Sequence, residues 1–123
     1  MAVMQSRNNR TFIAGANLSS AQFKFVTLES GGTVIVADSA GENAIGVCLA
    51  GGASGAAVTV CVSGSVMVEA GGTITAGAAV QAGADGTALA AASGDYVLGY
   101  AREAAVDGQI IEIELIQGGN IVA

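Results

Sequence analysis

Apolar residues alternate with small or polar residues along much of this chain, which predicts β-strands joined by glycine-containing turns. Residues 94–115 are expected to form a strand, a tight turn and a second strand. Its last part alternates strictly, with apolar Ile111, Ile113 and Leu115 separated by Glu112 and Glu114. Successive side chains of a strand point to opposite faces, so we expect the apolar residues to face inward and both glutamates to lie on a solvated outer face.

The same pattern occurs earlier in the chain. Residues 41–62 match residues 94–115 when the sequence is displaced by 53 positions, and three glycines coincide in each copy. In the earlier copy the alternating apolar positions are Val58, Val60 and Val62. We interpret the two segments as one duplicated β-hairpin, with these three valines also facing inward.

Shorter alternating segments predict further strands at 22–28, 33–37, 65–69, 78–81 and 87–89. Short strands separated by regular turns indicate an all-β fold, either a small β-sandwich or a partly open β-barrel. A helix over the alanine-rich part of residues 73–92 is the weaker interpretation, because glycines interrupt it. Residues 1–20 show no sustained periodicity. The sequence therefore predicts an extended N-terminal arm, residues 1–20, and a β-domain, residues 21–123.

The hydrophobic core is expected to be thin, which favours self-association. Hydrophobic residues make up 52% of the chain, yet there is no Trp and there are only five Phe and Tyr residues. A chain of this size exposes a large share of its surface, and exposed apolar patches tend to be contact surfaces. We expect an oligomer, most simply a homotrimer with threefold symmetry.

Charge is distributed unevenly. The net charge of −6 argues against a nucleic-acid partner, but all charged side chains among the first 28 residues are basic. A basic arm on an acidic body can contact a partner protein. Its apolar pair can add to a neighbour's sheet edge or fold onto its own domain, and we expect the arm to be ordered mainly by contact with a neighbouring protein. The candidate partner-binding residues are Arg7, Arg10, Phe12, Ile13 and Lys24.

Residue types restrict the possible chemistry. The absence of histidine and the presence of only two cysteines exclude Ser-His-Asp and Cys-His catalysis and the common zinc sites. We expect no cofactor and no metal. Cys48 and Cys61 flank the first turn on one face, which makes a cross-strand disulfide geometrically conceivable. Nothing indicates an oxidising compartment, so they are predicted to be free thiols. The uncharged stretch 43–68 alternates and contains glycines, so it predicts a hairpin rather than a membrane helix.

Two further patterns have plain structural interpretations. The spacing of Glu112 and Glu114 overlaps that of a glycosidase pair, but the chain has few aromatic residues to stack on a sugar, and a solvated strand face is favoured. The glycine clusters at 51–55 and 83–86 run into strand-like sequence with no following lysine. They predict hairpin turns rather than phosphate-binding loops.

The segments 69–80, 94–101 and 107–115 resemble the small capsid decoration, or cement, proteins of tailed bacteriophages. The shared features are a Gly-Gly-x-Ile-x-Ala-Gly segment, a later Gly-x-Ala segment, an Asp-Gly turn and a final alternating strand. The resemblance implies a β-rich, commonly trimeric domain on the outer surface of the expanded phage head. It also implies the major capsid protein as partner and synthesis in the bacterial host cytoplasm.

The sequence thus leads to one main hypothesis and two rivals. The main one is a non-enzymatic virion protein that stabilises the head by bridging major capsid protein subunits. Another self-associating phage structural or adhesive β-module, such as a glycan-binding tail or surface component, is the first alternative. The scarcity of Trp and Tyr counts against glycan binding. An enzyme is the second alternative, and the missing residue types count against it.

Overall fold

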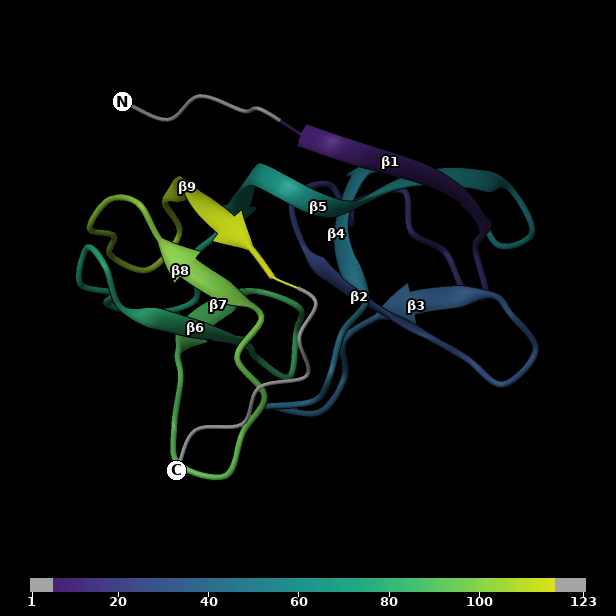
Figure 1. Ribbon diagram of the computed structural model, residues 1–123. Helices are drawn as coiled ribbons and strands as arrows, with labels where there is room; N and C mark the ends of the chain where they lie inside the picture. The colour runs from purple at the N-terminus through teal and green to yellow at the C-terminus, as the bar shows by residue number, and fades with distance from the viewer. Residues whose placement is uncertain (1–5, 117–123) are drawn as a thin grey trace.

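The computed structural model describes residues 6–116, which form nine β-strands and no helix (Figure 1). All strand pairs are antiparallel and belong to one curled, half-barrel sheet, so the predicted all-β fold is confirmed. The strands are β1 (Ser6–Ile13), β2 (Phe25–Leu28), β3 (Val34–Val36), β4 (Gly46–Ala50), β5 (Ala57–Glu69), β6 (Ala79–Ala82), β7 (Ala88–Ala90), β8 (Gly99–Ala101) and β9 (Ile110–Leu115). None of the residues 6–116 lies in a helix that could span a membrane.

The central strand of the sheet is β5, which is 13 residues long. The sheet order is β3-β2-β4-β5-β9-β8-β6-β7, and β1 also pairs with β5. The first half of β5 pairs with β1 and β4, whereas its second half pairs with β9. The sequence predicted a separate strand at 65–69; instead β5 continues through Gly64, which pairs with both β1 and β9 and has a φ of 93° that glycine adopts readily.

The two predicted hairpins have the same strand pairing. In the first, β4 faces β5 through the pair Val47–Cys61; in the second, β8 faces β9 through Tyr100–Glu114. Both members are displaced by 53 positions (47 to 100 and 61 to 114), as the sequence pattern indicated. The hairpin duplication is therefore confirmed.

The duplication extends beyond the hairpins to five strands. The β2–β3 pair Val26–Val36 recurs in β6–β7 as Val80–Ala90, displaced by 54 positions (26 to 80 and 36 to 90). The pairing of β1 with the first half of β5 recurs between the second half of β5 and β9. We call β1–β4 with residues 57–63 the first unit, and residues 64–69 with β6–β9 the second unit. Figure 1 shows these two groups of strands on either side of the chain, with β5 running across both.

Each face of the first unit's sheet packs into a different core. The alternation along β2, β4 and β5 places Val26, Cys48 and Val60 on an inner face, in a cluster confined to the first unit. Phe25, Val47 and Cys61 lie on the opposite, outer face and pack against the core of the second unit. The inward orientation predicted for the two alternating strands is confirmed, with Val62 half-buried and the other five apolar residues buried.

Three sequence expectations are corrected by this packing. Residues 6–13 are not ordered mainly by a neighbouring protein, because they pair along β5 of the same chain, and the following Ala14 and Leu18 are buried. Phe23 does not belong to the strand predicted over residues 22–28, because its φ is 66° and β2 begins only at Phe25. Cys48 and Cys61 are buried free thiols as predicted, but they lie on opposite faces, since Val47 rather than Cys48 is the partner of Cys61.

Candidate functional site

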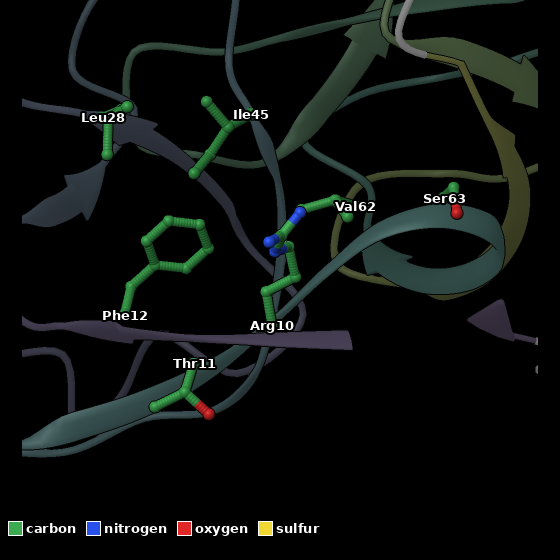
Figure 2. Close-up of a pocket in the computed structure, with 7 residues that line it drawn as sticks. All are labelled: Arg10, Thr11, Phe12, Leu28, Ile45, Val62 and Ser63. Atoms are coloured by element: carbon green, nitrogen blue, oxygen red, sulfur yellow. The ribbon is translucent and has the colours of Figure 1, made fainter. Parts of the chain in front are cut away.

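An open groove of about 610 Å³ lies on the first unit, between β1, the end of β2, the segment entering β4 and the middle of β5. Most of its apolar side chains belong to the margin of the inner-face core, so the groove is the open end of that core. The lining residues, all drawn in Figure 2, are Arg10, Thr11, Phe12, Leu28, Ile45, Val62 and Ser63.

Arg10 is the only charged side chain among these lining residues, and the alternation of β1 places it on the groove side. β1 is fixed by antiparallel pairing with β5, in which Arg10 lies opposite Val60 and Phe12 opposite Val58. Figure 2 shows the Phe12 ring pointing toward Leu28 and Ile45, whereas Thr11 points away from them. Residues two apart on a strand share a face, so Arg10 and Phe12 project on the same side.

The groove combines an apolar surface with a charged edge. Leu28 is 52% exposed, and Phe12 is half-buried against the inner-face core. Arg10 is exposed, as is usual for an arginine. Such a surface suits a protein partner that presents an apolar or aromatic side chain beside a carboxylate. Within residues 6–116, no three His, Cys, Asp or Glu side chains lie close enough together to hold a metal ion.

The structure brings only some of the predicted partner-binding residues together. Arg10 and Phe12 line the groove; Ile13 follows directly in β1, and 46% of its surface is exposed. Arg7 belongs to β1 at an irregularity in its pairing with β5. Lys24 does not line the groove. It is half-buried beside the turn between β6 and β7.

The surroundings of Lys24 contain one perturbed carboxyl group. The Thr87 hydroxyl donates a 2.6 Å hydrogen bond to Asp85, which lowers the pKa of Asp85, and the charge of Lys24 adds a smaller effect in the same direction. The Thr87 backbone N–H and hydroxyl both donate to the Asp85 carboxylate, so this carboxylate fixes the turn between β6 and β7. Lys24 therefore contacts the second unit of its own chain.

Sequence reasoning missed three apolar residues of the groove. Leu28, Ile45 and Val62 belong to regular apolar patterns, and such patterns do not show whether a position is covered. Leu28 gave the clearest signal, because it ends a strand directly before the polar turn at 29–32.

The second polar cluster of the chain lies on the second unit. Glu112 was expected on a solvated face but is buried, because Arg102 at the end of β8 folds over β9 and its guanidinium lies 2.9 Å from the Glu112 carboxylate. The Glu103 carboxylate accepts a hydrogen bond from the Glu112 backbone N–H. Glu114 is exposed as expected, 3.4 Å from Arg102. A buried carboxylate held by a cation is a structural ion pair rather than a free acid for catalysis.

Comparison with known proteins relates the chain to a protein family and to solved structures. The model of the phage cement protein family matches residues 8–115. The crystal structure of the head fiber gp8.5 N base of bacteriophage phi29 superposes with a TM-score of 0.74 at 22% sequence identity, covering 92% of this chain and 97% of that one. At that identity the superposition shows a common fold. No curated protein sequence matches the chain.

Proposed function

Since the chain belongs to the phage cement protein family, we propose that it is an outer capsid decoration protein that stabilises the expanded head by bridging neighbouring major capsid protein subunits. The family match over residues 8–115 is the observation that carries this proposal. The protein is a phage structural protein associated with the head. Its position on the outer capsid surface, its major capsid protein partner and a homotrimeric state are the finer parts of the proposal.

Bridging stabilises a shell through binding alone. A protein that binds the expanded lattice and not its dissociated subunits shifts the equilibrium toward the lattice by mass action. No bond is made or broken, so the chain needs a contact surface and no catalytic set. The residue inventory agrees with this role, because the exposed groove offers apolar contacts and one arginine rather than a nucleophile with its base.

The residues proposed to contact partner proteins are those predicted from the basic charge and the apolar pair of the N-terminal segment: Arg7, Arg10, Phe12, Ile13 and Lys24. Arg10 and Phe12 are supported by the groove geometry, and the 46% exposure of Ile13 adds apolar surface beside it. Exposed arginines act over about 8 Å at physiological ionic strength, so their contribution should weaken as salt is added.

The test uses purified protein and expanded heads that lack it. We expect the protein to co-sediment with heads at saturation and to raise the temperature at which the heads release DNA. The number of protein copies bound per head should be proportional to the number of major capsid protein copies in the head. No binding, or binding without any shift in DNA release, would refute the cement role.

A matched pair of variants tests the partner-binding residues in the same assay. Arg10→Glu should reduce the amount of protein bound to heads, because it removes a contact either with the capsid or with an adjacent copy of the protein. Thr73→Glu adds the same side chain at an exposed turn of the second unit and should bind like wild type. Equal binding by both variants would remove Arg10 from the contact surface. A glycan array with no specific signal would separate this role from an adhesive module.

A further inference from the structure

The duplication gives each unit the same two surfaces, which we call the rim and the outer face. The rim of the first unit consists of the apolar groove residues, and the rim of the second unit consists of the residues at the equivalent positions. The first rim is Phe12, Leu28, Ile45 and Val62, and the second is Val68, Ala82, Leu98 and Leu115. The outer face of the first unit was defined above by Phe25, Val47 and Cys61.

Within one chain, the outer face of the first unit covers the rim of the second. All four residues of the second rim are buried, in one cluster with the outer face of the first unit. Backbone hydrogen bonds join the two surfaces: the N–H of Phe25 donates to the carbonyl of Gly86 at 2.7 Å, and the N–H of Gly41 donates to that of Ala82 at 2.8 Å. The two units are therefore packed head to tail.

This arrangement leaves one rim and one outer face without a counterpart. The unused rim is the groove. The unused outer face belongs to the second unit, where Ala79, Tyr100 and Glu114 occupy the positions of Phe25, Val47 and Cys61. Tyr100 is 44% exposed and Leu28 is 52% exposed, so each open surface presents a large apolar side chain.

The glycines at the contact between the two units are covered, whereas the equivalent glycines on the two open surfaces are not. A Cβ added to Gly86 would meet Val36 and Phe25, and one added to Gly41 would meet Asp95. Their equivalents on the two open surfaces, Gly32 and Gly94, have no atom within 4 Å of an added Cβ. The backbone that is covered in one unit therefore faces open space in the other.

We propose that the groove binds the second unit's outer face of another copy of this chain, repeating between molecules the contact that joins the units within one. Charge favours this occupant. Arg10 takes the place of buried Val66, and Glu114 takes the place of Cys61, which lies in the same buried cluster. Neutral residues at these two positions inside the chain are thus replaced, on the open surfaces, by an arginine on the groove and by a carboxylate beside Arg102 on the outer face, so the two open surfaces carry opposite charges at these positions.

The contact joins two different surfaces, so it is heterologous and repeats in one direction. Such a contact closes into a ring when its rotation permits, and a ring of three is the homotrimer of the proposed function. The inference rests on that proposed self-association and is independent of capsid binding.

The first test is the molar mass in solution, measured by size exclusion with light scattering in the absence of capsids. Wild type should assemble to a multiple of its 11.9 kDa mass. Leu28→Asp, in the groove, and Tyr100→Asp, on the outer face, should each weaken assembly by roughly 30-fold or more. Val106→Asp is the matched control, because Val106 is 55% exposed but lies on neither surface. It should assemble like wild type.

Mixing the two defective variants gives the sharper test. Leu28→Asp retains an intact outer face and Tyr100→Asp retains an intact groove, so the mixture should form a one-to-one dimer that neither variant forms alone. The reversed charges of Arg10→Glu mixed with Glu114→Arg provide a second pair, should either aspartate variant fail to fold by circular dichroism.

Three results would overturn the proposal: a monomeric wild type, a Leu28→Asp protein that assembles like Val106→Asp, or variant mixtures that remain monomeric. Binding of heads by monomeric Tyr100→Asp would uphold the cement role separately. Failure of wild type to bind heads would leave the self-association result standing.

Discussion

Replacing Gly46 or Gly99 by alanine tests the duplication through its energetics. These glycines occupy equivalent positions at the start of β4 and β8. An added Cβ would lie 2.2 Å from the backbone carbonyl oxygen of Cys61 in the first case, and 2.3 Å from that of Glu114 in the second. Real Cβ atoms do not approach an oxygen so closely, and a backbone carbonyl cannot rotate away like a side chain.

The expected cost is similar at the two sites. Relieving either clash requires neighbouring strands to separate by about 1 Å, which strains packing and weakens ladder hydrogen bonds. We expect each substitution to lower the free energy of unfolding by about 2–4 kcal/mol, after the small entropic gain of replacing glycine. For a domain of this length that loss corresponds to a fall in melting temperature of roughly 8–15 °C.

Two matched controls separate the clash from other glycine effects. A Cβ added at Gly31 would meet no atom within 4 Å, and the residue has no positive φ, so Gly31→Ala should change the free energy of unfolding by less than about 0.5 kcal/mol. Gly55→Ala also has open space but a φ of 86°, so strain alone should cost about 1–2 kcal/mol.

The assay is urea denaturation followed by circular dichroism, at a protein concentration low enough to avoid assembly. The expected order of destabilisation is Gly31→Ala, then Gly55→Ala, then the Gly46 and Gly99 variants together. If Gly46→Ala and Gly99→Ala differ by more than about 2 kcal/mol, or if both match Gly31→Ala, the equivalence of the two units is wrong.

Two further predictions concern charged side chains. Arg102→Met should lower the free energy of unfolding in urea by about 1–2 kcal/mol, because it removes the cation beside buried Glu112. Glu114→Gln should lower it by less than about 0.5 kcal/mol, because Glu114 is exposed. Equal effects of the two substitutions would contradict a structural role for the buried pair. Asp85 has a folded pKa below its ordinary value of 3.8, so its ionised form favours folding. Asp85→Asn should therefore be less stable than wild type at neutral pH, with the difference vanishing as the pH falls through the folded pKa. A difference that persists in strong acid would point to the lost geometry instead.

The sequence predicted those features that depend on local patterns. Strict alternation in 111–115 identified the inward face of β9, and the coincident glycines identified the hairpin repeat, because turns with positive φ require glycine at Gly55 and Gly108. The wider duplication left little trace, since equivalent positions such as Phe25 and Ala79, or Leu28 and Ala82, share their place in the sheet but differ in size.

The errors arose where burial depends on partners distant in sequence. Glu112 follows the same alternation as Glu114, and only the fold of the β8–β9 loop over β9 gives it a cation and buries it. The segment from Ser6 shows no sustained apolar alternation, yet its backbone pairs with β5, with irregularities confined to residues 6–9. Two of the seven lining residues, Arg10 and Phe12, were among the predicted contact residues; the apolar residues Leu28, Ile45 and Val62 were not, because their exposure depends on which rim is covered.

The composition of the surfaces distinguishes the contact within the chain from the one proposed between chains. The outer face that is covered from the moment of folding is wholly apolar at Phe25, Val47 and Cys61, like the interior of a domain. The free outer face instead carries Tyr100 and Glu114, an aromatic residue with a polar end beside a charge, which is typical of surfaces that stay in water before they bind. A chain of two such units always ends with one open rim and one open outer face. Joining two chains in tandem would still leave one of each, so only closure into a ring satisfies every rim.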